Sequence, residues 1–461
     1  MKSRMCMLVA MGMASLFLSA CGGGGSASPP PPPSNVNEWT WVNGPNVVDQ
    51  KGIYGTQGLA ASSNVPGGRL ASVTGVDASG DFWLFGGYGV DSIGGQAYLN
   101  DLWKYSAGQW TWVNGANVVD QKGIYGTQGT AASGNVPGAR EGAVSWTDAT
   151  GGFWLFGGVG YDSTGNLGPL NDLWRYSAGQ WTWMSGSNLA YQPGTYGTKG
   201  MAAPDNVPGA RYGAVSWIDT IGSLWLFGGS DSTTTNEDLN DLWKYSAGQW
   251  TWMSGSNLAS QPGTYGTKGT AAPDNVPGAR REAVSWTDAS GNLWLFGGFG
   301  FIPTGGCCEL NDLWRYSGGE WTWMGGANVF DQPGTYLTRG TPSPGNAPGA
   351  REGAVSWTDA SGNFWLFGAV LGYGGPGRLS NLNDLWKYSA GEWTWVSGSS
   401  AVNQSGTYGT KGTPARGNVP GAGGGSASWT DASGNLWLFG GSRCDSTCNI
   451  GYLSDLWKYA P

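Results

Sequence analysis

Five arginines stand at one position of a repeated segment, and they are the residues of this sequence best suited to bind an anion. Each follows a Pro-Gly dipeptide and one small residue, and they are Arg69, Arg140, Arg211, Arg280 and Arg351. Guanidinium groups that converge on one point can hold a carboxylate or a sulfate in bidentate fashion. A residue present in nearly every copy of a repeat is usually structural. The alternative is that each arginine ties its own segment to the next, beside an acid such as Glu141 or Glu352.

Acids and tyrosines in the segments that vary from copy to copy form a second group of binding candidates. They are Asp231, Glu237, Asp238, Tyr161 and Tyr373. Function in repeated scaffolds lies in the elaborated loops, where such side chains can hydrogen-bond to a ligand or stack on it. For the acid pair Glu237 and Asp238, which lies on a polar segment, solvated charge is the commoner explanation.

The composition argues against several kinds of chemistry. The chain has no histidine, which removes imidazole general bases and the usual nitrogen ligands of copper and zinc. No Asp-x-Asp-x-Asp-Gly calcium loop is present. The formal net charge is −8 and the 23 basic residues are scattered, which disfavours a nucleic-acid partner. We therefore expect no metal, no cofactor and no nucleic acid, and nothing in the sequence requires the chain to be an enzyme.

The N-terminus has the features of an export signal. Lys2 and Arg4 precede an apolar run over residues 5–18, and Leu-Ser-Ala-Cys ends at Cys21. This is a lipobox, in which the Cys21 thiol accepts a diacylglycerol and becomes the mature N-terminus. Residues 1–21 are the predicted signal peptide. The lipid is the only predicted membrane contact, because the apolar run is shorter than the roughly 20 residues of a spanning helix.

Residues 22–37 form a predicted tether. Four glycines are followed, after a short linker, by five consecutive prolines. The glycine half should be flexible and the proline half an extended polyproline II spacer. By resemblance to bacterial lipoproteins, Gly22 behind the lipobox favours the outer membrane. The predicted location is therefore the cell envelope, in a leaflet that the sequence does not identify.

Four cysteines remain after Cys6 is removed with the signal and Cys21 is lipidated. Cys444 and Cys448 are spaced to close one loop by a disulfide, whereas Cys307 and Cys308 are adjacent and could pair only as a strained vicinal disulfide. Other connectivities remain open. Because export leads to an oxidising compartment, disulfides are expected in preference to reactive thiols.

A long internal repeat accounts for everything after the tether. The Trp-Thr-Trp triplet begins at Trp39, Trp110, Trp181, Trp250, Trp321 and Trp393, at spacings of 71, 71, 69, 71 and 72 residues. In the fourth unit, short alternating segments cover residues 277–287, 293–298, 310–316 and 321–326, which predict four strands, a to d. A period of this length, rich in strand formers and glycine, indicates a radial β-array.

The repeat resembles the kelch motif. Unit four carries a double glycine at Gly297 and Gly298, then Asn-Asp-Leu-Trp-Arg-Tyr over residues 311–316, and a spaced Trp321. The match recurs in all six units over residues 38–461, with Ala369 in place of the second glycine in unit five. The resemblance implies an all-β, six-bladed kelch β-propeller with four antiparallel strands in each blade. Since the chain ends after strand c of the last unit, residues 38–43 should supply its strand d and close the ring.

The two faces of such a propeller should differ. The a–b and c–d turns are short, whereas the b–c segments and the d–a crossings are long and share the opposite face. The crossings are nearly uniform. The b–c segments differ in every unit and cover residues 88–99, 159–170, 230–239, 299–310, 369–382 and 442–453. Recognition is expected there, and the repeated arginines would ring the channel mouth on this face.

Two functions follow from these observations. The first is a monomeric, non-catalytic scaffold of the cell envelope whose b–c segments contact a protein or a glycan. The second is a carbohydrate-active enzyme similar to the sialic-acid epimerases among kelch proteins, which would use the arginines as an axial ring. The copper-radical oxidases that share the kelch repeat are a poor match because this chain has no histidine.

Overall fold

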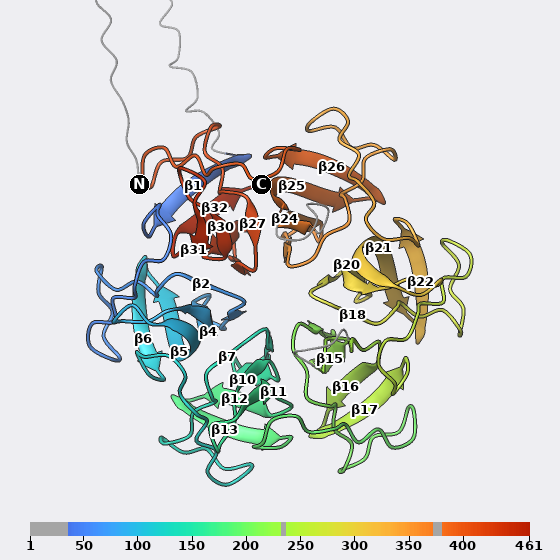
Figure 1. Ribbon diagram of the computed structural model, residues 1–461, viewed down its shortest axis with the longest axis horizontal. Coiled ribbons are helices and arrows are strands. Elements are labelled where there is room, and N and C mark those ends of the chain that lie inside the picture. The colour runs from blue at the N-terminus through green and yellow to red at the C-terminus, as the bar shows by residue number, and fades with distance from the viewer. Residues whose placement is uncertain (1–35, 232–236, 372–379) are drawn as a thin grey trace, which may run out of the picture. The chain divides into compact units, whose positions relative to one another are not determined.

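The computed structural model describes residues 36–231, 237–371 and 380–461 of the chain. The chain divides into two units, Met1–Ser34 and Asn35–Pro461, and all described residues belong to the second. Every regular element assigned among them is a β-strand. Six sheets of four or five strands, paired antiparallel, surround a common centre (Figure 1). The fold is the expected six-bladed β-propeller.

The strands run from the centre outward in the order a, b, c, d. Blade 1 holds β3 (Val73–Val76), β4 (Phe82–Val90), β5 (Gln96–Ser106) and β6 (Gln109–Asn114), and blade 2 holds β8 (Val144–Thr147), β9 (Phe153–Phe156), β12 (Leu173–Ser177) and β13 (Gln180–Ser185). Blade 3 holds β14 (Val215–Ile218), β15 (Leu224–Phe227), β16 (Leu242–Ser246) and β17 (Gln249–Ser254), and blade 4 holds β19 (Val284–Thr287), β20 (Leu293–Phe301), β21 (Cys307–Ser317) and β22 (Glu320–Gly325). Blade 5 holds β23 (Val355–Thr358), β24 (Phe364–Leu371), β25 (Ser380–Ser389) and β26 (Glu392–Ser397), and blade 6 holds β28 (Ala427–Thr430), β29 (Leu436–Phe439), β32 (Leu456–Ala460) and β1 (Glu38–Asn43).

The first and last strands of the propeller pair with each other. In β1, Glu38 lies opposite Ala460 and Trp39 lies opposite Tyr459 of β32. The blue β1 therefore lies beside the red end of the chain in Figure 1. Trp39 is 1% exposed and packs edge-on against Trp457. This pairing completes blade 6 and covers the edge of β32 that would otherwise be open.

Aromatic side chains fill the space between neighbouring blades. Each of the six apolar clusters joins two adjacent blades, as where Trp217 and Phe227 of blade 3 meet Trp314 and Trp321 of blade 4. The rings of Trp314 and Trp321 lie edge to face, with centroids 6.4 Å apart. Buried aromatic rings of this size contribute large apolar area and favour this geometry. The first tryptophan of the Trp-Thr-Trp triplet is buried in every blade.

The d–a crossings cover the outer strand of the blade that follows them. Ala61, in the first crossing, pairs with Trp110 of β6, and the Asn64 side-chain amide donates to the Trp110 carbonyl at 3.1 Å. The same asparagine contact recurs in the other five blades. The crossings therefore shield the edges of the outer strands, which explains why their sequences are nearly uniform.

The b–c segments are ordered hairpins in four blades and not irregular loops. In blades 1 and 4, strands b and c continue into the hairpin and pair with β2 (Arg69–Leu70) and β18 (Arg280–Arg281). In blades 2 and 6 the hairpins form small sheets of their own, from β7 (Arg140–Glu141), β10 (Val159–Tyr161), β11 (Leu167–Pro169), β27 (Gly423–Gly424), β30 (Ser442–Cys444) and β31 (Ile450–Tyr452). In blade 1 the Asp91 carboxylate closes the hairpin by accepting the amides of Ile93, Gly94 and Gly95.

Candidate functional site

The five repeated arginines are buried inside their blades and do not line the channel. Each is 1% exposed. Arg140 is representative: its Nη1 and Nη2 donate to the two carboxylate oxygens of Asp172 at 2.6 and 2.8 Å. Its Nε and Nη1 also donate to the carbonyls of Gly138 and Gly157, both at 2.9 Å. Bidentate pairs of the same kind join Arg69 to Asp101, Arg211 to Asp241, Arg280 to Asp312 and Arg351 to Asp384. The expectation of an anion site at a ring of arginines is wrong.

A tyrosine from the d–a crossing completes each of these buried clusters. The Tyr125 hydroxyl donates to Asp172 at 2.6 Å, and the Trp174 indole donates to the same oxygen at 2.7 Å. Burial, and then the neighbouring carboxylate, raise the pKa of Tyr125 well above its usual range, so the hydroxyl keeps its proton. The arginine therefore ties the crossing to its blade, as the structural alternative expects. The acid that does this is the strand-c aspartate, and not Glu141 or Glu352.

Blade 6 makes a related cluster from a different position, with one guanidinium–carboxylate hydrogen bond in place of two. It has Gly423 where the other blades have the arginine, and Arg443 of β30 lies directly opposite Gly423. In blades 1, 2 and 4 the pair is reversed, with arginine on the short first strand and glycine opposite. Arg443 is 0% exposed and forms an ion pair with Asp455. The sequence contains a sign of this exchange. The sixth unit lacks the repeated arginine but has Arg443 in its b–c segment.

The predicted acids of blade 3 behave differently from one another. Glu237 is exposed, whereas Asp238 is 0% exposed and accepts from Arg281 at 2.9 and 3.1 Å. The expectation that both are solvated is therefore wrong for Asp238. Asp231 is half-buried near Arg211, and burial, followed by Glu237, raises its pKa. Glu237 and Asp231 carry no other feature that marks a site.

The remaining predicted residues fall in three places. Tyr161 packs edge-on against Tyr98, with ring centroids 6.1 Å apart. Cys444 and Cys448 form a disulfide within the blade 6 hairpin. The Cys308 thiol is free, so the vicinal bond to Cys307 is not formed, and burial, with Asp331 next, raises the pKa of Cys308 to about 11. Cys21 and Tyr373 lie outside the described residues.

One layer of the propeller changes its chemistry from blade to blade, and we call it the mouth layer. In each blade it holds three residues. One follows the repeated arginine position, and the other two lie opposite it on the two arms of the b–c segment. From blade 1 to blade 6 these triplets are Leu70/Tyr88/Tyr98, Glu141/Val159/Pro169, Tyr212/Ser230/Asp238, Arg281/Phe299/Glu309, Glu352/Val370/Asn381 and Gly424/Ser442/Tyr452. The framework directly below is nearly identical in every blade. The mouth layer is therefore where this molecule can distinguish one ligand from another.

A closed ring of backbone hydrogen bonds lies at the base of this layer. We call it the axial ring, and its members are Ala71, Gly142, Gly213, Glu282, Gly353 and Gly425. Each amide donates to the carbonyl of the preceding member at 2.7–3.1 Å, and Ala71 closes the circle by donating to Gly425. All six residues have φ between 51° and 67°. This left-handed conformation favours glycine, which occupies four of the six positions.

Glu282 is the departure from this pattern that carries a functional group. It keeps the ring geometry at a φ of 52° and extends a carboxylate into an axial cavity of about 360 Å³. Its Oε2 lies 3.5 Å from the place where a β-carbon on Gly353 would stand, so it reaches over the ring. Glu282 remains solvent-exposed in this cavity. The partial loss of water around its carboxyl raises the pKa of Glu282. A strained non-glycine residue at such a place points to function.

Further acids of the mouth layer crowd around Glu282. Burial, and next the charge of Glu282, raise the pKa of Glu141 to about 7 and that of Glu352 to about 8. Arg281 packs over the Phe299 ring at 4.3 Å and is paired with Asp238. Several carboxyl groups therefore share one half of the mouth with a single arginine whose charge is already balanced.

Tyrosines occupy the other half of the mouth. Tyr88 packs edge-on against Tyr98 with centroids 5.2 Å apart, and it contacts Tyr452 of blade 6 at 5.7 Å. All three are half-buried. Burial, followed by the charge of Glu141, raises the pKa of Tyr98 to about 12, so its hydroxyl stays protonated near neutral pH. The mouth thus combines neutral aromatic hydroxyls with carboxyl groups.

The channel below the axial ring is lined by the inner strands and is structural. Strand-a serines line a second axial space of about 370 Å³. The Ser145 hydroxyl donates to the Thr74 carbonyl of blade 1 at 2.7 Å, and the Ser285 hydroxyl donates to the Ser216 carbonyl of blade 3 at 3.1 Å. These repeated contacts join neighbouring blades and leave no distinctive group for a ligand.

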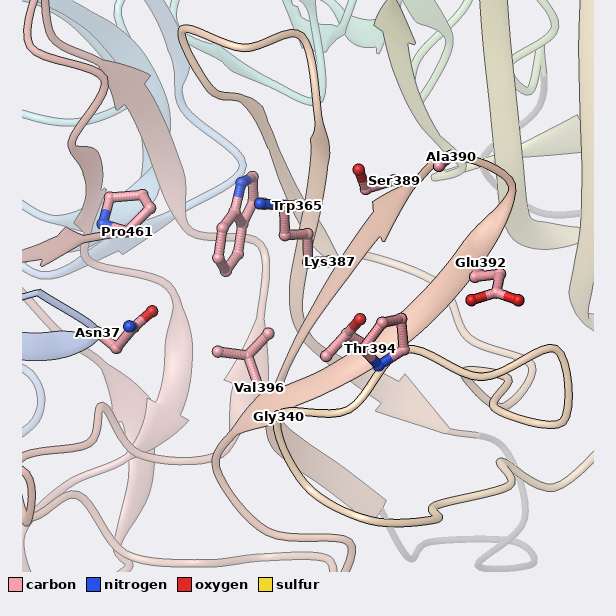
Figure 2. A pocket seen from close by; sticks show the side chains of 11 residues that line it. Asn37, Gly340, Trp365, Lys387, Ser389, Ala390, Glu392, Thr394, Val396 and Pro461 are labelled. Carbon is pink, nitrogen blue, oxygen red and sulfur yellow. The ribbon is translucent and has the colours of Figure 1, made fainter.

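Another cavity, of about 600 Å³, lies between blade 5 and the two ends of the propeller. Figure 2 shows its side chains, among them Lys387, Thr394 and Val396 of blade 5, with Asn37 and Pro461 from the chain ends. The blade 5 residues have the counterparts Lys104, Thr111 and Val113 in blade 1. Because this cavity is built from repeated framework positions, its size does not mark it as a specific site, and we favour the smaller axial one.

The mouth layer also leaves a signal in the sequence. The position after the arginine reads Leu, Glu, Tyr, Arg, Glu, Gly through the six units, and the next position departs from glycine only at Ala71 and Glu282. Variation inside an otherwise uniform strand marks these positions. The partners on strands b and c could not be assigned without the register.

No protein-family model and no curated protein matches the chain. The solved structure of YjhT is similar at a TM-score of 0.49 and 13% identity, over 85% of this chain and 95% of that one. A fungal alcohol oxidase of the AA5 family, in complex with copper, gives a TM-score of 0.42 and 14% identity, over 85% of this chain and 62% of the oxidase. In the residues that the structure describes, no helix is long and apolar enough to cross a membrane.

Proposed function

We propose that this chain is a lipid-anchored binding protein of the cell envelope that holds a glycan in its mouth layer and b–c hairpins without reacting with it. The observation that carries the proposal is the change of side-chain chemistry from blade to blade at this one layer of a uniform framework. The anchor rests on the lipobox that ends at Cys21 and on the Gly/Pro-rich tether behind it.

The mouth offers the groups that bind sugars. Tyr88, Tyr98 and Tyr452 present aromatic rings with hydroxyl groups, and Glu141, Glu282 and Glu352 present carboxyl oxygens. Aromatic rings can stack on the apolar face of a sugar while carboxyl groups accept its hydroxyl protons. Binding sites of this kind are concave and contain a few convergent polar groups.

The same groups argue against a sialic acid as the ligand. The arginines that would bind its carboxylate are buried and already paired. In the mouth that carboxylate would instead face Glu282 and Glu352, which repel it whenever they are ionised.

A second function, proton transfer on a bound sugar, is favoured by one observation. The carboxyl of Glu352 has a pKa of about 8 and that of Glu141 a pKa of about 7, which suits a general acid and a general base near neutral pH. Exchange between the two anomers of a bound sugar, followed by NMR, tests this function. Exchange that is accelerated by the protein and lost in Glu352→Gln would replace the non-catalytic proposal.

The binding proposal is tested with the mature protein in detergent. Neutral, amino and sialylated oligosaccharides are presented on one array, and wild type is compared with Tyr88→Ala. We expect binding to neutral or amino glycans that falls about tenfold or more in the variant, since loss of one stacked ring commonly removes over 1 kcal/mol. Binding restricted to sialylated glycans, or no binding to any glycan, would contradict the proposal.

A further inference from the structure

We infer that the ligand of the mouth carries a protonated amine, and that Glu282 holds this amine above the axial ring. The inference rests on the proposed function, since it names the chemical class of the glycan that the mouth takes. Three features of the described residues carry it: the charge balance, the position of Glu282 and the shape of the cavity.

Acidic groups outnumber basic groups in the mouth. Asp238 pairs with Arg281, the one basic residue of the mouth layer among the described residues. Arg281 also attracts Glu282 and Glu352, but the carboxyl groups of Glu141, Glu282 and Glu352 form no hydrogen bond or ion pair with a described side chain. Carboxylates gathered in one layer without an ion pair of their own are unfavourable, because they repel one another and favour the protonated form. A cation placed among them would relieve this repulsion and favour the ionised form.

Glu282 is the one acidic residue among the six members of the axial ring. The axial ring requires left-handed backbone, which is unfavourable for a non-glycine residue. Glycine is present at this position in four blades, and Ala71 shows that a small side chain is tolerated without adding a charge. The Glu282 side chain passes within 3.3 Å of a β-carbon position on Gly213 and reaches toward Gly353, so its carboxylate stands over the ring. No packing role of Glu282 requires a carboxylate.

The cavity suits an organic cation better than a bare metal ion. It encloses about 360 Å³, and its walls include the apolar side chains of Leu70 and Val370. Tyr88 and Tyr98 stand in the same layer. Protonated amines are attracted both to carboxylates and to aromatic faces. A glycan with a free amino sugar offers the amine to Glu282 and its ring to the tyrosines.

The test compares two probes that differ only in the amine. Calorimetric titration of the mature protein in detergent uses a glucosamine disaccharide and its N-acetylated counterpart, near pH 7 and at low salt. We expect the glucosamine disaccharide to bind about tenfold tighter, a difference typical of one charge-assisted hydrogen bond. Added salt should reduce this preference, because ions screen the attraction.

Three variants separate the role of Glu282 from its effect on the fold. Glu282→Gly restores the residue that most blades have, and Glu282→Gln keeps the shape without the charge. Ala71→Gly is the matched control, because it makes the same change of backbone on another blade without removing a carboxylate. We expect both Glu282 variants to lose the preference for the amine and Ala71→Gly to keep it.

Three other outcomes would overturn the inference, and each leads to a different conclusion about the ligand. Equal affinity for the two disaccharides, with binding that still depends on Tyr88, would leave the proposed function in place and remove the amine from it. Failure of both probes to bind would contradict the amine ligand, and the glycan array would then decide the proposed function separately. Binding of Ca²⁺ that Glu282→Gly abolishes, without binding of the amine, would assign the carboxylates to a metal ion.

Discussion

At the scale of single residues, the buried arginine clusters are structural, and blade 6 shows how strictly they are kept. Arg443 supplies from β30 the guanidinium that Gly423 of β27 does not supply. Removing one partner of a buried pair leaves the other as an uncompensated charge. We expect Arg443→Gly to lower the free energy of unfolding by about 3–5 kcal/mol, measured by chemical denaturation. The double variant Gly423→Arg/Arg443→Gly recreates the arrangement of blade 1 and should recover most of the loss. A double variant as unstable as the single one would contradict this explanation.

The raised pKa of Glu352 gives a second prediction at this scale. Glu352 faces Glu282, Arg281, Glu309 and Asp238, and its pKa in the fold is about 8 against a usual value of 4.5. Between these two values the folded protein binds more protons than the unfolded chain, so this group lowers stability as the pH rises through the range. Glu352→Gln should therefore match wild type near pH 5 and be more stable at pH 8.5 by about 1–2 kcal/mol.

The matched control is Glu237→Gln, which removes an exposed carboxylate from the b–c segment of blade 3. Melting temperatures of both variants and of wild type, taken at the two pH values, check the prediction. If the control gains the same stability at pH 8.5, the effect comes from net charge and not from the crowding of Glu352 in the mouth.

At the scale of elements, β1 closes the ring by pairing with β32, although no turn joins these two strands. Trp39 fills a buried place between β1, Trp457 and Tyr459. A chain that begins after residue 43 should expose the edge of β32 and self-associate, whereas one that begins at residue 36 should stay monomeric in size-exclusion chromatography. A synthetic peptide of residues 36–43 added to the shorter chain should restore the monomer. A stable, monomeric chain without β1 would show that closure does not hold the ring together.

The elements were predictable from the sequence to the extent that they repeat. Six copies of one pattern gave the strands, the turns and the blades, because apolar alternation and glycine-containing turns report local backbone. The b–c segments have no common pattern, so the sequence predicted loops where the structure has hairpins. The arginines were placed at the channel for a related reason. The sequence gives the spacing between Arg140 and Asp172, but only the strand register brings the two side chains together.

At the scale of the whole molecule, the anchor and the binding face are separate parts of the proposal. If Cys21 carries the lipid, the protein should enter the detergent phase of a Triton X-114 extraction, and Cys21→Ser should move it to the aqueous phase. The propeller is not changed by this substitution, so glycan binding should be the same for both forms. Equal partitioning of the two forms would contradict the lipid anchor without touching the binding site.

The measurement that tests the central claim most directly compares two variants within one hairpin of blade 1. Tyr98 lies in the mouth layer, whereas Ile93 stands at the hairpin tip and is 78% exposed. On the glycan array, Tyr98→Ala should weaken binding about tenfold or more, and Ile93→Ala should bind as wild type does. The opposite result, in which the tip variant loses binding and the mouth variant keeps it, would place recognition on the outer loops and contradict an axial site.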